Sequence, residues 1–433
     1  MPEVTGEAVG RFYTQSAMTL ALLSLLALLV AILISSLRSD MNTGIVAVVL
    51  AFLIGVYGAG LSVAEVAAYL PEQLVLTLVG VALLFGMAEH NGALARVAQY
   101  ALAASGGHPA LLPPLFFLLT FTLSAIGPGN IAAVALLAPI GMRLAMSAGI
   151  NPLLMAIVIC TGANAGAFSP VALTGSINAG LIAQIGVRDS VLVSQIFIRV
   201  AALQSLSALT GYFIFGGYRA RAESRGPRLA VTLEPFNTRH LVTLLAILTL
   251  SAGVIFFKVS TVVGAFVLAG VLALFKVGDS EASIKSLPWN VIVLVAGISV
   301  LIGLIEKTGG LNLATTAIAA YASAGTVNAA LAFTSGLVSV YSSSSGVVMP
   351  VFIALIPDLI QKLGGGNVIE MIVAVDLGSH MVDVSPLSTL GALCLAALPE
   401  TVNKVRLFRQ LLAWGLAMAV VGAGFAWVFL DVL

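Results

Sequence analysis

Charged residues are scarce in this chain. Of its 433 residues only 9% are Asp, Glu, Lys or Arg, whereas 60% are hydrophobic and the mean hydropathy is +1.11. A soluble domain carries about 25% charged residues, and a soluble fold of this size has no way to hide so much apolar surface. The shortage of charge therefore excludes a soluble protein and predicts an integral membrane protein with many spans.

The chain also lacks the features that other functional classes require. It contains neither HExxH nor GxxxxGK followed by Ser or Thr, the motifs of zinc peptidases and of nucleotide-driven pumps. Its only two cysteines, Cys160 and Cys394, lie in apolar runs, which favours ordinary buried thiols. The net charge of +1 gives no reason to expect a nucleic-acid partner. These absences predict no enzyme, no resident cofactor and no nucleic-acid binding.

What the chain does contain is the same membrane unit twice. PEQLVLTLVGVALLFGMAEHNGAL, beginning at Pro71, aligns with PWNVIVLVAGISVLIGLIEKTGGL, beginning at Pro288. Further on, GANAGAFSPVALTG at 162–175 aligns with GSHMVDVSPLSTLG at 378–391. A repeat whose polar segments interrupt apolar stretches is typical of secondary transporters, which bind their substrate between the two halves near the bilayer midplane.

We divide the chain into a first repeat at 1–217, a polar linker at 218–239 and a second repeat at 240–433. Each repeat is predicted to hold five spans and one re-entrant helical hairpin. The predicted fold class is an all-α polytopic membrane protein with two inverted repeats and broken helices at midplane. The spans are expected near 16–37, 44–68, 72–89, 151–185 and 190–217, and near 240–257, 261–276, 289–305, 368–398 and 405–430.

An odd number of spans per repeat means that the second copy enters the membrane upside down. With the linker on the inner side, most of the 19 Lys and Arg residues also fall on that side. Positive residues prefer the cytoplasmic side. We therefore expect a multi-pass protein of the cell inner membrane with a cytoplasmic linker and both termini outside.

Two apolar stretches, 109–147 and 326–363, are each split by a polar tip into two arms that we expect to be half the length of a span. The first tip reads SAIGPGN and the second reads YSSSSG. Glycine lets the backbone approach a ligand closely, and the new helix that starts after the proline points free N–H groups into the protein. Such residues also help helices to pack, but two tips at matching repeat positions favour function. We predict substrate binding by Ser124, Gly127, Pro128, Gly129, Asn130, Ser343, Ser344 and Ser345.

The fourth span of each repeat is predicted to be broken, at 162–175 and at 378–391. Unwound helices free carbonyl groups for Na⁺ and N–H groups for an anion, although a kink that serves packing alone is the alternative. From these breaks Ser169, Thr174, Ser388 and Thr389 join the predicted substrate site. The predicted Na⁺ ligands are Asn130, Asn164, Ser345 and Asp383.

Asp376, His380 and Asp383 place ionisable groups at membrane depth, where they are costly and usually functional. Asp376 and His380 are four residues apart and share a face of an intact helix, and a histidine beside carboxylates titrates near neutrality. We assign these three residues to ion coupling. The alternative is a buried, hydrogen-bonded cluster that stiffens the break.

The segments SAIGPGNIAAVALLAPIG and TGANAGAFSPVALTGSINAGLIA resemble the malonate and dicarboxylate carrier branch of the ion transporter superfamily, which includes the divalent anion:sodium symporters. In those symporters each tip carries Ser-Asn-Thr. The first triplet falls here on Gly129-Asn130-Ile131, where only Asn130 matches, and the second tip has Ser344-Ser345-Gly346 without the asparagine. The resemblance implies a homodimer with a fixed scaffold and an elevator-like transport domain.

We therefore expect a secondary active transporter of a small organic anion, a dicarboxylate such as malonate or a C4-dicarboxylate, coupled to Na⁺ or H⁺. The alternative is a cation/proton antiporter, or an exporter of arsenite or another inorganic anion, of the same superfamily. The acidic cluster favours the alternative, whereas the first tip suits an anion. A membrane enzyme using His380 and Asp383 is disfavoured because the spacing of metal ligands is absent.

Overall fold

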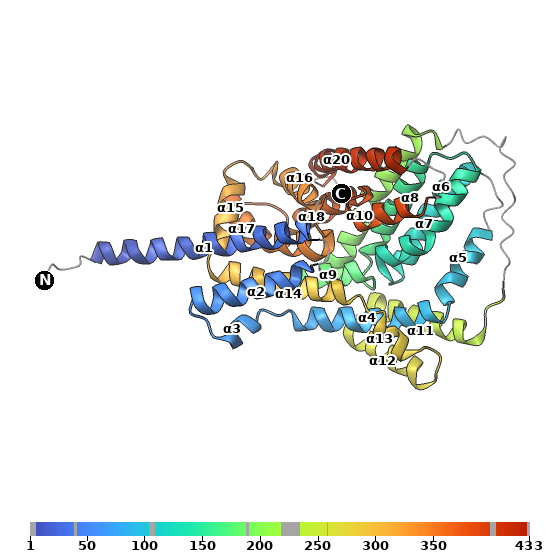
Figure 1. Ribbon diagram of the computed structural model, residues 1–433, viewed down its shortest axis with the longest axis horizontal. Coiled ribbons are helices and arrows are strands. Elements are labelled where there is room, and N and C mark those ends of the chain that lie inside the picture. Colours follow the sequence, from blue (N-terminus) through green and yellow to red (C-terminus); the bar gives the residue numbers. More distant parts are fainter. Residues whose placement is uncertain are drawn as a thin grey trace.

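A computed structural model describes residues 6–38, 41–103, 109–187, 190–217, 234–257, 259–340, 342–398 and 404–430. Every element within these ranges is a helix (Figure 1). The predicted all-α fold class is therefore confirmed. Most of the predicted linker, residues 218–233, and Tyr341 of the second predicted tip lie outside the described residues.

The first half of the chain begins with a long helix and ends with another, and a hairpin and a broken helix lie between them. Its elements are α1 (Gly6–Leu37), α2 (Thr43–Phe52) with a π-helical continuation (Leu53–Gly58), α3 (Val63–Ala67), α4 (Glu72–His90), α5 (Ala93–Ala103), a 3-10 turn (Pro109–Leu111), α6 (Leu112–Ala125), α7 (Gly129–Ser147), α8 (Pro152–Ala167), α9 (Leu173–Gln184) and α10 (Ser190–Ile214).

The second half follows the same order. Its elements are α11 (Thr238–Phe257), α12 (Thr261–Leu274), α13 (Ser280–Lys285), α14 (Trp289–Lys307), α15 (Gly310–Ala319), α16 (Val327–Ser339), a π-helical turn (Ser344–Val348) that leads into α17 (Met349–Leu363), α18 (Val368–Met381), a 3-10 turn (Val382–Val384), α19 (Thr389–Ala396) and α20 (Lys404–Phe429).

Matching helices of the two halves begin in the same way. α8 is capped by Asn151, whose Oδ1 accepts from the Leu153 N–H at 3.0 Å, and α18 is capped by Asn367, whose Oδ1 accepts from the Ile369 N–H at 2.9 Å. Asparagine is a preferred N-cap because its side chain replaces a missing backbone acceptor in the first turn. Equivalent sequence signals therefore start both broken helices.

The second helix of each half packs against the fourth helix of the other half. α2 lies along α14, and α12 lies along α4. Gly80 on α4 and Gly297 on α14, which coincide in the repeat alignment, make both contacts close. A Cβ on Gly297 would lie 2.1 Å from the Gly44 carbonyl oxygen, and one on Gly80 would lie 2.9 Å from the Phe266 ring. This reciprocal exchange agrees with a twofold relation of the halves, while their inversion in the membrane stays a prediction.

Figure 1 shows two groups of helices on opposite long sides of the molecule. α2, α4, α11, α12 and α14 run along one long side, and the hairpin helices, the broken helices, α10 and α20 fill the other. α8 and α18 lie at the centre of that second side, and nearly all of their side chains are buried. α6 packs along α8, and α16 packs along α18.

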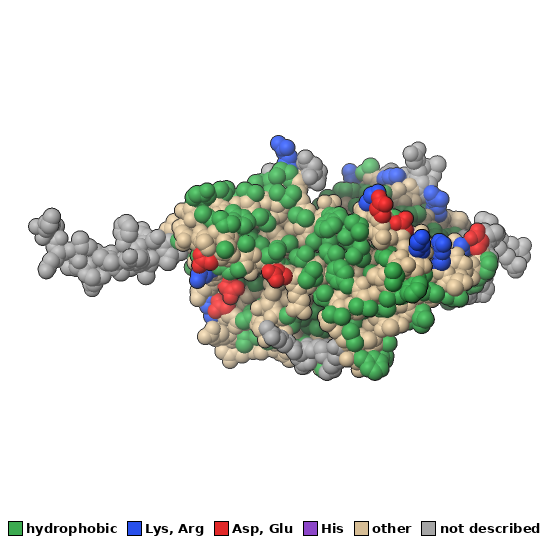
Figure 2. All heavy atoms as spheres, turned by 90° about the horizontal axis from the view of Figure 1, so that it is seen from below, with side chains coloured by type: hydrophobic (Ala, Val, Ile, Leu, Met, Phe, Trp, Pro, Cys, Tyr) green, Lys and Arg blue, Asp and Glu red, His purple; other side chains and the backbone are tan. Residues whose placement is uncertain are grey.

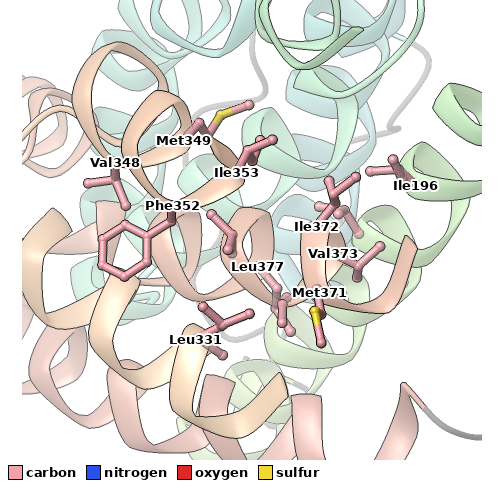
Figure 3. Close-up of a cluster of buried hydrophobic side chains, with 14 of the residues drawn as sticks. Ile196, Leu331, Val348, Met349, Phe352, Ile353, Met371, Ile372, Val373 and Leu377 are labelled. Carbon is pink, nitrogen blue, oxygen red and sulfur yellow. The ribbon is translucent and has the colours of Figure 1, made fainter. Parts of the chain in front are cut away.

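The core around α18 is built from large aliphatic side chains. Figure 3 shows Met371, Ile372, Val373 and Leu377 of α18 among side chains of α10, α16 and α17. A second cluster joins α6, α7, α8 and α19, and it contains Cys160 and Cys394. Both cysteines are free and buried, and their Sγ atoms lie 3.7 Å apart, a contact that their sequence positions did not predict.

The outer surface is suited to lipid. Hydrophobic side chains cover much of the face in Figure 2, and charged side chains gather toward the two ends of the long axis. Large apolar residues such as Leu245, Phe256 and Leu274 are exposed. Six helices of the described ranges are long and apolar enough to cross a membrane: Glu72–His90, Gly129–Ser147, Val191–Ile214, Trp289–Lys307, Ser344–Leu363 and Lys404–Phe429.

Three expectations about single helices were wrong. The stretch 44–68 is not one span, because the chain turns after Gly58 into a separate helix, α3, which starts at the Ser62–Glu65 capping box. The outgoing hairpin arms, 129–147 and 344–363, are full span length and not half length. Both helix breaks are also shorter than predicted.

The reason for the shorter breaks is the role of their glycines. Helix α8 continues to Ala167, and the first break covers only 168–172. Gly162 and Gly166 lie within the helix, where a Cβ would come within 2.5 Å of the Phe117 and Phe121 carbonyl oxygens of α6. These glycines therefore permit close packing of two helices. In the same way α18 continues to Met381, so the second break covers 382–388.

Candidate substrate and ion site

Polar side chains from both halves meet where the two helices are broken. Asn164 of α8 is the centre of this network. Its Oδ1 accepts from Asn130 Nδ2 at 2.7 Å, and its own Nδ2 donates to the His380 carbonyl oxygen at 2.8 Å and to Asp383 Oδ2 at 3.2 Å. Asn130 is the second residue of α7, at the first tip. One amide thus links the first hairpin to the second broken helix.

The second hairpin reaches the same network through Asp383. The Ser344 hydroxyl donates to Asp383 Oδ1 at 2.7 Å, and the Ser388 hydroxyl donates to the same oxygen at 3.1 Å. The Ser339 hydroxyl lies 2.7 Å from that of Ser344. Asp383 is only 5% exposed. Since a buried carboxylate is costly unless it is hydrogen-bonded, its three donors from three segments explain how it is held there.

His380 lies at the edge of this network. Its Nδ1 is 2.9 Å from the Asp376 carbonyl oxygen, and its Nε2 is 3.1 Å from the Ser345 hydroxyl. A carbonyl oxygen only accepts, so Nδ1 carries the proton, and in the neutral ring Nε2 accepts from Ser345. The Phe168 ring from the first break meets the imidazole edge-on, with a centroid distance of 4.8 Å. The position of the ring is therefore fixed from both halves.

The predicted coupling residues do not form a single side-chain cluster. Asp376 and His380 share a face of intact α18, as expected, but they touch only through the Asp376 carbonyl group. The Asp376 carboxyl group instead accepts from Asn178 of α9. Asp383 belongs to the network around Asn164. His380 and Asp383 thus share Asn164 as a partner, whereas the carboxyl group of Asp376 has an environment of its own.

The first tip owes its shape to glycine. Gly127 has a φ of 141°, and a Cβ there would lie 1.7 Å from the Phe85 ring. Gly129 has a φ of 83°, and Pro128 precedes the first turn of α7. No side chain caps α7, although Asn130 Oδ1 accepts from the following N–H at 2.9 Å. The positive end of the α7 dipole therefore points into the buried site.

The remaining predicted residues are less central. Ser124 is fully buried, and its hydroxyl has no partner. Ser169 and Thr174 are buried beside the first break. Ser343 is exposed and caps the turn that follows, accepting from the Gly346 N–H at 3.1 Å, and Thr389 is exposed at the start of α19. Within the described ranges, none of these five side chains bonds to the Asn164–Asp383 network.

Three polar residues were missed by the sequence reasoning. Ser339 and Ser379 extend the second half of the network, and Asn178 pairs with Asp376. The signal for Asn178 was present, because an asparagine inside the apolar run SINAGLIA is as unusual as Asn164. The two serines gave no signal, because a serine hydroxyl in a helix often bonds to a carbonyl group of its own helix.

The donor set fits an alkali cation better than a transition metal. Around Asp383 the groups are carboxylate, hydroxyl, amide and main-chain carbonyl oxygens, the ligands that hard cations prefer. No three His, Cys, Asp or Glu side chains of the described ranges lie close enough to hold a metal ion. If Na⁺ binds here, these oxygens would hold it.

Comparisons with known proteins agree with this architecture. Residues 18–167 match the family model described as the N-terminus of the dicarboxylate carrier protein MatC. The YdaH transporter of Alcanivorax borkumensis, whose crystal structure is described as having an unusual topology, is similar in fold with a TM-score of 0.55. The sequences are 15% identical, and the likeness covers 85% of this chain and 87% of that one. No curated protein matches the chain.

The fold defines a class. Within the described ranges the chain is all-helical, six of its helices are long and apolar enough to cross a membrane, and its fold is similar to that of a membrane transporter. More particularly, its N-terminal third resembles the dicarboxylate carrier protein MatC.

Proposed function

We propose that this chain is a secondary active transporter of a small organic anion, a dicarboxylate such as malonate or a C4-dicarboxylate, coupled to Na⁺ or H⁺. The dicarboxylate class is supported by the family match over residues 18–167. The observation that carries the proposal is the bond network from Asn130 through Asn164 to Asp383 and Ser344. It joins both hairpin tips and both broken helices at one buried point.

The network combines groups suited to an anion with groups suited to a cation. The N-terminal end of α7 offers a positive dipole and backbone N–H groups to a carboxylate. Asp383 offers a negative charge to Na⁺. A cation held at Asp383 would screen that charge from an anionic substrate bound beside it. Electrostatics alone therefore couples the two ligands, because each binds better when the other is present.

We further propose alternating access by an elevator movement in a homodimer of the cell inner membrane, with both termini outside. The helices along one side of Figure 1, α2, α4, α11, α12 and α14, would form the scaffold. The hairpins and broken helices would form the moving domain, because the site lies wholly among them. The proposed repeat boundaries stay at 217 and 240.

Transport by purified protein in proteoliposomes tests the proposal. Labelled malonate, succinate and an inorganic anion would be offered with and without a Na⁺ gradient or a pH gradient. We expect accumulation of a dicarboxylate that depends on one of the gradients. Exchange of a cation for protons, or export of an inorganic anion alone, would instead favour the alternative function, for which the buried Asp383 is the supporting observation.

A pair of hydroxyl deletions on the second hairpin sharpens this test. Ser344→Ala removes the 2.7 Å bond to Asp383 and should reduce dicarboxylate uptake. Thr334→Ala removes an exposed hydroxyl of α16 that bonds only within its own helix, for example to the Ala330 carbonyl at 2.6 Å, and should leave uptake unchanged. Equal effects would mean that the hairpin responds to any substitution.

A further inference from the structure

Asp376 lies apart from the Asn164–Asp383 network. Its carboxyl group is fully buried in the middle of α18, one turn before His380. Among the residues that the structure describes, the one side chain that donates to it is Asn178, whose Nδ2 bonds to Asp376 Oδ2. Asn178 lies on α9 of the first half and is 2% exposed. The pair is thus a second polar link between the halves, inside an apolar core.

Two oxygen atoms of this pair lack a donor. Asp376 Oδ1 and Asn178 Oδ1 are both buried, and neither has a hydrogen-bond partner in the part of the chain that the structure describes. A carboxylate oxygen and an amide oxygen are both acceptors. Orphaned buried acceptors are costly and call for an explanation, such as a missing proton or ion. Because both orphaned oxygens belong to one side-chain pair, a single missing proton or ion between them would explain both.

No charge compensates Asp376. Within the described ranges it forms no ion pair. The ionisable groups on its own helix and on the elements packed against it are Glu370, His380, Asp383, Cys160, Arg199, Tyr212, Asp358, Lys362, Lys404, Arg406 and Arg409. An ionised carboxylate without a partner in such an interior is so costly that the group takes up a proton instead.

One proton satisfies both orphaned oxygens. A carboxylic acid and a primary amide form a cyclic pair in which the amide N–H bonds to one acid oxygen and the acid O–H bonds to the amide oxygen. The first of these bonds, from Asn178 Nδ2 to Asp376 Oδ2, is present. A proton on Asp376 Oδ1 would supply the second. A sodium ion fits less well, because hard cations take about six oxygen ligands and the pair has only two unused ones.

We propose that Asp376, paired with Asn178, binds the coupling proton, at a site separate from that of the substrate. The assignment rests on the proposed transport function. An O–H bond forms on Asp376 with a proton taken from water on one side of the membrane. It breaks when the proton is released to water on the other side. Nothing else is consumed in the step.

Net uptake and exchange separate this role from substrate binding. Asp376→Asn keeps an uncharged side chain that can pair with Asn178, so it imitates the protonated state. In proteoliposomes it should lose accumulation driven by a pH gradient and retain counterflow, in which labelled dicarboxylate outside exchanges for unlabelled dicarboxylate inside. Asp358→Asn is the matched control. Asp358 lies on neighbouring α17 and is paired with Lys362 at 2.9 Å, so its variant should keep both activities.

An infrared titration detects the proton on Asp376 without any measurement of transport. In detergent-purified wild type we expect a carbonyl band of a protonated carboxylic acid that Asp376→Asn abolishes. Asn178→Ala keeps the acid and removes its partner, so it should shift the band and the pH dependence of uptake. If Asp376→Asn does not fold, the wild-type band and its shift in Asn178→Ala decide the question. A wild type without counterflow contradicts the transport function, whereas the band still tests the proton site.

Other outcomes overturn the assignment. If only a Na⁺ gradient drives wild-type accumulation, and Asp376→Asn changes its Na⁺ dependence, the pair is a sodium site. If Asp376→Asn accumulates substrate on a pH gradient as wild type does, or leaves the infrared band in place, Asp376 carries no proton that matters for transport.

Discussion

Replacement of Asn130 should weaken substrate binding in a protein that still folds. In Asn130→Ala, Asn164 Oδ1 loses its donor at 2.7 Å, and the Ile131 N–H loses its acceptor at 2.9 Å. Leaving a buried polar group unsatisfied costs about 1–3 kcal/mol. If substrate binding depends on this ordered tip, the dissociation constant should rise about 5- to 150-fold, because about 1.4 kcal/mol is a factor of ten.

The measurement is calorimetric titration of purified protein with malonate and succinate, together with the rise in melting temperature that each substrate causes. Asn151→Ala is a matched control on the far end of α8. It removes a cap that bonds to the Leu153 N–H at 3.0 Å and should cost about 0.5–2 kcal/mol of stability without changing affinity. An Asn130→Ala protein that binds substrate as tightly as wild type would refute the reasoning and remove Asn130 from the site.

Three further substitutions test other parts of the structure. Asp383→Asn removes a charge but keeps most hydrogen bonds, so the folded protein should transport with an abolished or altered dependence on Na⁺ or H⁺, measured by uptake at varied ion concentrations. His380→Gln should move the pH profile of uptake if the imidazole titrates, whereas a wild-type profile makes the ring structural. Gly378→Ala places a Cβ 2.1 Å from the Ala332 carbonyl oxygen of α16, whereas Gly424→Ala on α20 meets open space; thermal unfolding should show a loss only in the first.

The sequence singled out residues that meet at the centre of the candidate site, because polar residues at membrane depth are rare. Asn130, Asn164, Ser344 and Asp383 were singled out from apolar surroundings, and the structure joins them by hydrogen bonds. Repeat alignment contributed as much, because it identified both tips and both broken helices as equivalent. A single polar residue in one helix would not have predicted a meeting point.

What the sequence did not predict depends on neighbours that are distant along the chain. Gly162 and Gly166 were interpreted as part of a break, but they lie in an intact helix, where they admit the α6 backbone. A glycine that breaks a helix and a glycine that packs one look alike in the sequence, and only the partner distinguishes them. The pairing of Asn178 with Asp376 was missed for the same reason.

The two halves contribute different chemistry to the Asn164–Asp383 network and to the Asp376–Asn178 pair, and this asymmetry has a physical consequence. The first half supplies amides, Asn130, Asn164 and Asn178, which stay neutral and can both donate and accept. The second half supplies the ionisable groups, including Asp376 and Asp383. Each amide that crosses the boundary bonds to a carboxyl group or a main-chain carbonyl. A change of charge on a carboxyl group of the second half therefore alters the hydrogen bonds of amides in the first half. The proposed coupling between an ion and a substrate bound by both halves requires such a connection.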